Sequence, residues 1–485
     1  MSPRVSIFWL LLAAAALVRI GVLAAVPDAL AADPDGYREL AENVVEHGVF
    51  GHGRVPTAYR PPAYPLLLVP FVSAGAGAPV AMGALHVALG LATVGLTFAL
   101  ARRAGMRDVP AALAGGLVAL DPILLAQSTL VMSETLAALL VVLGIYLALP
   151  FLGPNVVGTR RVPSLSRKPP ASETRTLISR FERWTRRPGG AALTGAAWGA
   201  AVLCRPALLA FAIPAAVVLP WLTGRVGGGL PAGRGREVVR TCGAMLAGLI
   251  VVISPWIVRN HLVIGRPTPA TTHGGYTLLL GNNPFFYHHL RTGRWFHAWR
   301  AEPFHAWWRR ELRADDLIEP AAHSIEHAHN MIEPPAIHDD AAPPLRFRSP
   351  EAELQADALA YRHAFASMLR QPGMFAWSCL VRAGRFWSPV PFQVSPEESP
   401  LRRAARRGVA AWYVVVVSLA AMGLRCASST RRARRNVLLC SLLLAATLTA
   451  VHTFYWSNLR MRAPLMPLVA LAAAEGATSL RRRGH

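Results

Sequence analysis

Long apolar runs recur along the chain and alternate with short polar segments. Runs of about twenty apolar residues match the length that a helix needs to cross the hydrocarbon core of a bilayer. The pattern predicts ten crossings, at residues 5–26, 79–100, 109–125, 130–149, a broken pair within 190–221, 238–258, 409–424, 437–455 and 464–480. We therefore expect an all-α polytopic membrane protein.

Two polar segments decide the expected domain organisation. The first, at 27–62, follows the first crossing and is rich in acidic residues. The second, at 259–408, is long enough to form a small domain. We expect a transmembrane module at 1–258 that includes the first outer loop, an α-rich extracytoplasmic domain at 259–408, and C-terminal transmembrane helices at 409–485.

The net charge of +23 comes from arginines that cluster between the apolar runs, above all in the segment 151–189. Positive charge in short loops is typical of the cytoplasmic side of a membrane protein. A nucleic-acid-binding protein would instead gather this charge on one binding surface. The pattern predicts a multi-pass protein of the inner (plasma) membrane, with both termini cytoplasmic, membrane lipids around it and no nucleic-acid partner.

Carboxylates, arginines and tyrosines gather on the outer side that this topology predicts. Arginine binds phosphate oxygens through two parallel hydrogen bonds, and a carboxylate can orient an acceptor hydroxyl and take its proton. Together these groups suit chemistry on a phosphate-linked lipid at the membrane surface. The candidates are Asp33, Asp35, Tyr37, Tyr59, Arg60 and Tyr64 in or beside the first outer loop, and Glu134, Arg205, Arg259 and Arg462 at later outer turns.

Each candidate also has a purely structural explanation. Asp33-Pro34-Asp35-Gly36 is an ordinary turn or helix N-cap sequence, and Glu134 suits the first turn of a helix. Arginines at the ends of crossings, such as Arg259, often extend to the interface. Arg19 lies inside the first crossing, where a charge is costly and indicates a function or a buried partner.

Seven short motifs occur in order along most of the chain. They are Asp33-Pro34-Asp35-Gly36-Tyr37 with Ala41, Arg60-Pro61-Pro62-Ala63-Tyr64-Pro65, Met132-Ser133-Glu134-Thr135, Arg205-Pro206, Ser254-Pro255-Trp256-Ile257-Val258-Arg259-Asn260, Gly274-Gly275-Tyr276 with Gly281-Asn282-Asn283-Pro284, and Arg460-Met461-Arg462-Ala463-Pro464. In this series the chain resembles the GT-C superfamily of integral membrane glycosyltransferases. The likeness is strongest to bacterial relatives of protein O-mannosyltransferases and of the lipid A aminoarabinose transferase, a group similar to glycosyltransferase family 39.

The resemblance implies a glycosyltransferase that takes a sugar from a polyprenyl-phosphate donor, undecaprenyl-based in a bacterium, and inverts the configuration at the sugar. The acceptor would be a hydroxyl of a lipid, a glycan or a protein. The family pattern places an essential aspartate four residues before a tyrosine, which corresponds to Asp33. Because Pro34 stands where the family often has glutamate, Asp35 remains the alternative.

The resemblance also assigns the remaining site residues. Glu134 matches a second acid in an outer loop, and Arg60 matches a basic residue that contacts the lipid phosphate. The other candidate donor contacts are Tyr37, Tyr59, Tyr64, Arg205, Arg259 and Arg462. The branches that this chain resembles generally use no metal, so a divalent ion is not favoured and no other cofactor is expected.

Two other classes of function remain as alternatives. A lipid or glycan transporter, or a flippase, would need polar residues at mid-membrane depth, where Arg19 and His86 are the clear examples, and usually internal repeats. A non-catalytic scaffold of the cell envelope would need no active site. Replacing Asp33 and Asp35 by asparagine separates these alternatives from an enzyme.

Overall fold

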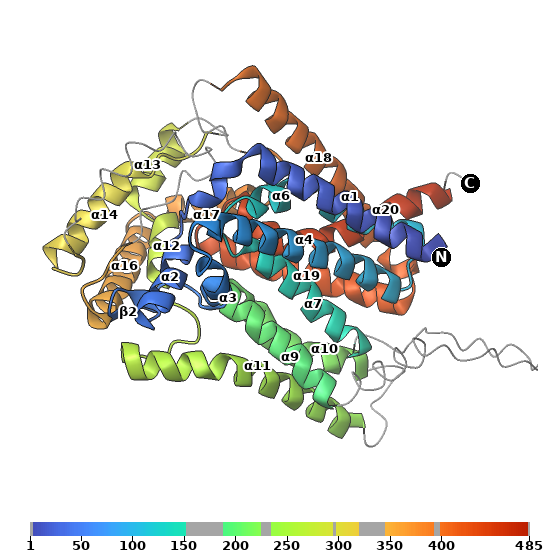
Figure 1. Cartoon of the computed structure of the whole chain (residues 1–485), viewed down its shortest axis with the longest axis horizontal. Helices are drawn as coiled ribbons and strands as arrows, with labels where there is room; N and C mark the ends of the chain where they lie inside the picture. The colour runs from blue at the N-terminus through green and yellow to red at the C-terminus, as the bar shows by residue number, and fades with distance from the viewer. Residues whose placement is uncertain are drawn as a thin grey trace, which may run out of the picture.

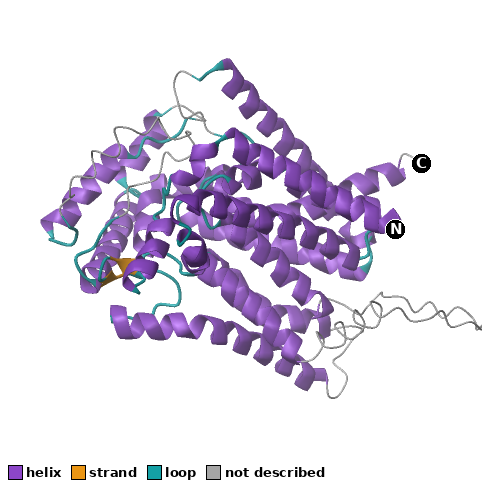
Figure 2. Ribbon diagram, viewed as in Figure 1, coloured by secondary structure: helices purple, strands orange, loops and turns teal. Residues whose placement is uncertain are grey.

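The structure, a computed structural model, describes residues 3–151, 188–224, 234–293, 297–319, 345–391 and 398–483. Within these ranges the chain is helical almost throughout (Figure 2), and its two strands form one short hairpin, β1 (Gly51–His52) and β2 (Val55–Pro56). The predicted all-α fold class is confirmed. Most of the basic segment 151–189 lies outside the described residues.

Seven helical segments of the described chain are long and apolar enough to cross a membrane, and a pair bent by 50° would add an eighth. The predicted broken pair at 190–221 forms the shorter helices α9 (Pro188–Cys204) and α10 (Leu209–Gly224). The chain is therefore a multi-pass membrane protein, although fewer than the ten predicted crossings have the full length. The seven segments are carried by α1 (Pro3–Ala25), α4 (Ala78–Arg103), α7 (Glu134–Ala148), α11 (Arg234–Ile264), α18 (Pro400–Arg425), α19 (Arg432–Phe454) and α20 (Met466–Arg483).

A buried arginine accompanies the bend between α5 (Asp108–Ala119) and α6 (Pro122–Ser128). Arg19 of α1 is 1% exposed and donates hydrogen bonds to the carbonyl oxygens of Ala119 (3.3 Å) and Val118 (3.4 Å). The last carbonyls of a helix have no partner within that helix, and lipid offers none. Arg19 thus stabilises the bend, which gives the charge inside the first crossing a structural role.

Glycines let neighbouring crossings approach closely. A Cβ added at Gly195 of α9 would overlap the carbonyl oxygen of Met245 in α11, and a Cβ at Gly248 would overlap that of Ala192. Helices α18 and α20 also meet at glycines. Because helices in lipid associate through close packing rather than through the hydrophobic effect, these contacts hold the bundle together.

Shorter helices gather toward one end of the bundle, and both termini lie at the other end (Figure 1). Aromatic side chains such as Phe286, Trp299, Phe304 and Trp456 form a second hydrophobic core there. These helices are α2 (Tyr37–His47), α3 (Ala63–Val72), α12 (Gly274–Gly281), α13 (Pro284–Thr292), α14 (Glu302–Ala314), α16 (Pro350–Arg370) and α17 (Pro372–Trp387). Short 3-10 turns connect many elements: η1 (Pro27–Ala31), η2 (Gly75–Gly77), η3 (Leu149–Phe151), η4 (Pro206–Leu208), η5 (Cys426–Ser429) and η6 (Leu459–Leu465).

Helix α17 ties this end to the crossings. The fully buried Arg382 donates to the carbonyl oxygen of Thr453 (2.8 Å) at the end of α19 and to that of Gly281 at the end of α12. The Trp387 indole donates to the Thr449 hydroxyl (2.9 Å). Helix α11 also extends past the expected boundary at 258, and α18 begins before 409. The segment 259–408 is thus joined to the bundle by continuous helices and by buried hydrogen bonds.

The close contact between α9 and α11 predicts a sharp difference between two glycines of α11. We expect Gly248→Leu to force the helices apart and to lower the melting temperature (Tm), since overpacking of this kind typically costs about 1–3 kcal/mol. Gly243→Leu is the matched control, because a Cβ at this exposed position meets no other atom. Thermal melts of the purified protein in detergent measure both, and equal Tm values would contradict the packing argument.

Candidate active site

The first outer loop turns sharply into α2, and Asp33 caps that helix. One carboxylate oxygen of Asp33 accepts a hydrogen bond from the Tyr37 amide (2.9 Å), and the other accepts one from the Glu39 amide (2.9 Å). Gly36, which lies between Asp33 and Tyr37, has a φ of 70°, a left-handed conformation that glycine adopts without strain. Burial raises the pKa of Asp33 to about 6, although both amides oppose the shift. The first candidate acid is therefore engaged by the backbone of α2.

Asp35 lies two residues further on and faces the cationic side chain of Arg60. The guanidinium of Arg60 is 3.3 Å from the Asp35 carboxylate, and it lies over the rings of Tyr37 (5.8 Å) and Tyr59 (5.5 Å). Burial by itself lowers the pKa of Arg60, but Asp35 together with Tyr37, Tyr59 and Tyr276 outweighs this effect, so the pKa is raised overall. Arg60 therefore stays positively charged.

A second ion pair lies at the break between α9 and α10. Glu134 is the first residue of α7, and Arg205 precedes Pro206 in an extended conformation. Their side chains are 2.7 Å apart, and that of Glu134 is only 2% exposed. The second carboxylate oxygen of Glu134 is buried and has no hydrogen-bond partner among the described residues. Glu134 thus has one oxygen committed to Arg205 and one available.

Arg460 joins the two ion pairs into a single network. It lies in η6, 3.7 Å from Asp35 and 4.0 Å from Glu134. Positive and negative side chains therefore alternate in the order Arg60, Asp35, Arg460, Glu134, Arg205. Four parts of the chain supply them: the first outer loop, α7, the α9–α10 break and η6.

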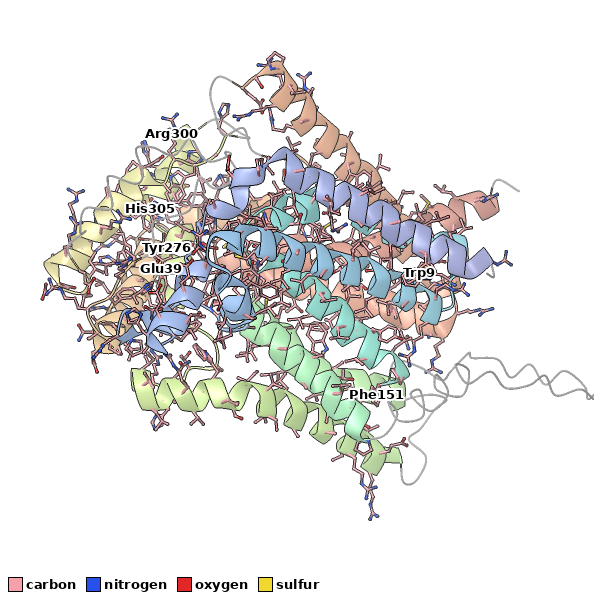
Figure 3. All side chains as sticks on the ribbon, in the orientation of Figure 1. Trp9, Glu39, Phe151, Tyr276, Arg300 and His305 are labelled. Atoms are coloured by element: carbon pink, nitrogen blue, oxygen red, sulfur yellow. The ribbon has the colours of Figure 1, made fainter. Side chains whose placement is uncertain are left out.

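This network lines a cavity of about 790 Å³ between the bundle and the outer helices. Tyr276 of α12, labelled in Figure 3, is one of the residues that line the cavity from the side of the outer helices. The remaining lining is mixed. Aromatic rings come from Tyr37, Tyr59, Tyr361, Tyr455 and Trp456, and apolar side chains come from Leu209, Ala210, Ile213, Pro214, Leu280 and Val451. The cavity thus combines a charged wall with an apolar wall.

Six of the ten candidate residues line the cavity: Asp35, Tyr37, Tyr59, Arg60, Glu134 and Arg205. Asp33, Tyr64, Arg259 and Arg462 are not among the described lining residues. The hydroxyl of Tyr64 instead bonds to His86 (2.6 Å), which bonds in turn to the carbonyl oxygen of Ser128 (2.9 Å). Tyr64 therefore lies in the protein behind the cavity wall.

Arg259 and Arg462 bind backbone carbonyls. Arg259 donates to the carbonyl oxygens of Thr57 (2.8 Å) and Phe50 (2.9 Å), and so anchors the first outer loop to α11. Arg462, 1% exposed, donates to those of Phe386 (3.2 Å) and Ser388 (2.8 Å) at the end of α17. Both arginines therefore fix backbone segments and are not among the described residues that line the cavity.

Several cavity residues were not among the ten candidates from the sequence, and Arg460 is the most important of them. Arg460 belongs to the same motif as Arg462, but the tight turn of η6 directs the two side chains to different surroundings. His273 stacks on Tyr59 with ring centroids 4.3 Å apart. Burial, followed by the charge of Arg60, lowers the pKa of His273 well below its usual value, so this ring is neutral. The sequence signal for His273 was its position directly before the Gly274-Gly275-Tyr276 motif.

Comparisons with known proteins bear on the family that the chain resembles. The family model described as dolichyl-phosphate-mannose-protein mannosyltransferase matches residues 64–161, which include Glu134. The resemblance to the GT-C glycosyltransferases is confirmed. The prediction of a membrane glycosyltransferase therefore holds, while the site residues remain predictions, because the match excludes the first outer loop.

Two solved structures are similar to the chain at low identity. ArnT from Cupriavidus metallidurans in the apo state is 18% identical, with 92% of this chain and 72% of that chain covered and a TM-score of 0.35. The same protein bound to undecaprenyl phosphate is 17% identical, with 96% and 77% covered and a TM-score of 0.38. No curated protein matches the chain.

The raised pKa of Asp33 predicts how its contribution to stability changes with pH. A carboxyl group that binds its proton more tightly in the folded than in the unfolded protein stabilises the fold at low pH, and this contribution is lost as pH rises toward its folded value. Between the ordinary aspartate pKa of about 3.9 and the value of about 6, we expect the Tm of the wild type to fall relative to that of Asp33→Asn. Thermal melts across this range measure the difference.

The control for this experiment is Asp28→Asn, since Asp28 is exposed in the same loop. Its Tm should follow that of the wild type at every pH. If the Tm curves of the wild type and Asp33→Asn ran parallel across this pH range, Asp33 would have the same pKa in the folded and the unfolded protein, which would contradict the prediction.

Proposed function

We propose that the chain transfers a sugar from a polyprenyl-phosphate donor to an acceptor hydroxyl at the outer face of the inner membrane, with inversion at the anomeric carbon. The observation that carries the proposal is the alternating network of three arginines and two carboxylates at the wall of the cavity. A donor of this class has a charged phosphate next to a long apolar chain. The cavity has one wall suited to each.

The apolar wall suits the prenyl chain. Leu209, Ala210, Ile213 and Pro214 belong to α10, at the broken pair of crossings, and Val451 belongs to α19. Apolar side chains in membrane-crossing segments can receive a lipid chain from the bilayer without exposing it to water. The donor phosphate would then lie toward the end of these helices, next to Arg205.

The arginines suit the phosphate, both bound and leaving. The network contains three guanidinium groups and two carboxylates, which leaves one positive charge in excess. Fixed guanidinium groups in a site with little water stabilise negative charge that develops on a leaving phosphate. We assign this role to Arg60, Arg460 and Arg205.

Asp35 is our candidate for the acid that orients and deprotonates the acceptor. The acceptor oxygen would attack the anomeric carbon as the bond from that carbon to the phosphate oxygen breaks, with the electron pair leaving on the lipid phosphate. The acceptor proton would pass to Asp35 late in the reaction, because an ordinary aspartate, with a pKa of about 3.9, is a weak base. Binding of phosphate to Arg60 and Arg460 would also release Asp35 from its two cationic partners.

Asp33 is less suited to this role than Asp35. Asp33 is not among the described lining residues of the cavity, and both of its carboxylate oxygens already accept hydrogen bonds from the Tyr37 and Glu39 amides. The available oxygen of Glu134 suits a second contact to the acceptor or to the sugar. Among the described residues, no three histidine, cysteine or acidic side chains are placed to hold a metal ion, and our assignment of roles uses none.

The orientation in the membrane follows from the same proposal. Both termini lie at the end of the bundle opposite to the outer helices (Figure 1). With the cavity at the extracytoplasmic face, the termini would be cytoplasmic, as the distribution of arginines predicts. The division into parts at 1–258, 259–408 and 409–485 is likewise our proposal.

Replacing Asp35 separates binding from chemistry. We expect Asp35→Asn to lower sugar transfer by about 100-fold or more, the usual contribution of a catalytic acid or base. Binding of undecaprenyl phosphate should be retained or tightened, because the carboxylate that competes for Arg60 and Arg460 is removed. Single-turnover transfer and a titration with undecaprenyl phosphate measure the two effects.

Asp33→Asn serves as the comparison and should keep more activity than Asp35→Asn. The reverse order would identify Asp33 as the essential acid. Unchanged transfer in both variants would favour a scaffold, and lipid translocation by reconstituted vesicles without transfer would favour a flippase.

Two neighbouring arginines should respond differently to the same substitution. Arg460→Gln removes a cation of the network, and we expect it to weaken binding of undecaprenyl phosphate by about tenfold, as loss of a charge-assisted hydrogen bond does. Arg462→Gln should mainly lower the Tm, because it weakens the buried bonds to the Phe386 and Ser388 carbonyls. Similar binding by the wild type and Arg460→Gln would remove Arg460 from the phosphate site.

A further inference from the structure

One face of helix α16 contacts two loops of the cavity wall. Glu353, Asp357 and Tyr361 are spaced four residues apart, which aligns them along one side of the helix. Glu353 and Asp357 bind the backbone or hydroxyls of these loops, and Tyr361 lines the cavity. Helix α16 belongs to the outer part of the protein, so this face connects that part to the site.

Glu353 binds three donors from two loops. The Ala58 amide (3.0 Å) and the Thr272 hydroxyl donate to one oxygen of its carboxylate, and the Thr57 hydroxyl donates to the other. Glu353 is 1% exposed, and both threonines are 3% exposed. The two loops also bond to each other, since the Thr272 amide donates to the Ala58 carbonyl oxygen (3.1 Å).

Two contacts lead from Glu353 to Arg60. The Thr57 hydroxyl that donates to Glu353 accepts a hydrogen bond from the Tyr59 amide (2.9 Å). The Tyr59 ring then packs between the guanidinium of Arg60 and the ring of His273. Arg259 donates a hydrogen bond to the Thr57 carbonyl oxygen (2.8 Å). Thr57 is therefore fixed at both its hydroxyl and its carbonyl group.

The second loop is held in a similar way. Asp357 accepts a hydrogen bond from the Gly275 amide (2.7 Å). A Cβ added at Gly275 would overlap backbone atoms of α16, and a Cβ at Gly274 would overlap the Tyr361 hydroxyl. The glycines thus allow the loop to lie directly on the helix, with His273 next to the cavity.

We propose that Glu353 is a positioning residue, through which α16 holds the loop of Tyr59 and Arg60 against the loop of His273 and so fixes the phosphate-binding guanidinium of Arg60. This inference rests on the proposed function, which assigns the phosphate to Arg60. Glu353 lines no part of the cavity described above, so it acts through its neighbours.

The chemistry of the contact explains why glutamate is needed. Two carboxylate oxygens satisfy three donors at once, whereas glutamine offers one acceptor oxygen and would turn its amide toward a donor. Aspartate is one methylene shorter and loses reach. Burial raises the pKa of Glu353, against the effect of its three donors. Among substitutes for Glu353, glutamine keeps the reach and one acceptor oxygen, aspartate keeps two oxygens but loses the reach, and alanine has no acceptor. We therefore expect phosphate binding to be kept best by glutamine, less by aspartate and least by alanine.

The test uses the purified full chain in detergent and undecaprenyl phosphate as the probe. We expect Glu353→Ala to weaken binding of this lipid by about tenfold or more, as displacement of a positioned group does. Glu353→Gln should bind the lipid more tightly than Glu353→Asp, because the role of the Glu353 side chain depends on its reach and hydrogen bonding rather than on its charge. Glu351→Gln is the control, since Glu351 is exposed two residues earlier on the same helix and should bind as the wild type does.

The two threonines distinguish positioning from a merely structural role. Thr57→Val removes only the hydroxyl on the Arg60 loop, and Thr272→Val removes only the hydroxyl on the His273 loop. Both should lower the Tm, and Thr57→Val should lower it more because the Thr57 hydroxyl also accepts from the Tyr59 amide. Only Thr57→Val should weaken phosphate binding, and Thr57→Ser, which keeps the hydroxyl, should bind as the wild type does. These variants also give the answer if Glu353→Ala fails to fold.

Failure of the inference and failure of the proposed function give different results. If the wild type binds undecaprenyl phosphate no better than the uncharged alcohol undecaprenol, the assignment of the phosphate site is wrong. If the wild type prefers the phosphate but the Glu353 and Thr57 variants bind it equally well, or Thr57→Val and Thr272→Val weaken it alike, Glu353 has no positioning role.

Discussion

Two carboxylates and three guanidinium groups form ion pairs with one another at the cavity, and the site depends on their mutual attraction. The five side chains are only 2–18% exposed, and charges at such depth are stable only when they are paired. Each charge comes from a segment whose fold brings it to the network. The ion pairs therefore both stabilise the junction of these segments and keep three cations ready for a phosphate, which can replace a carboxylate as their partner.

Seven arginines of the described chain have two kinds of partner. Arg60, Arg205 and Arg460 pair with carboxylates in the cavity. Others bind backbone carbonyls where a helix ends or a loop begins: Arg19 at the bend after α5, Arg259 at the first outer loop, Arg382 at the ends of α12 and α19, and Arg462 at the end of α17. A guanidinium carries five donors, so one buried arginine can satisfy several carbonyls that lipid would leave without partners.

The outer helices contribute to the site without supplying its charges. Helix α16 binds the first outer loop through Glu353 and the loop before α12 through Glu353 and Asp357. Helix α17 is bonded to α19, which carries Val451 of the apolar wall. The cavity is thus enclosed by elements far apart in sequence, and its shape depends on contacts between the segment 259–408 and the crossings.

The sequence by itself determined the helical membrane fold and the place of most crossings, because apolar length and the distribution of charge are local properties, and its ordered motifs carried the resemblance to glycosyltransferases. It also predicted that Asp35, Arg60, Glu134 and Arg205 lie on one side of the membrane, and in the structure all four line one cavity. Only the tertiary structure decided that Asp33 caps α2 while Asp35 faces Arg60, and that Arg460 rather than Arg462 joins the network. Residues two apart in a tight turn differ in direction, and direction depends on backbone conformation and on what packs around it, which no local pattern encodes.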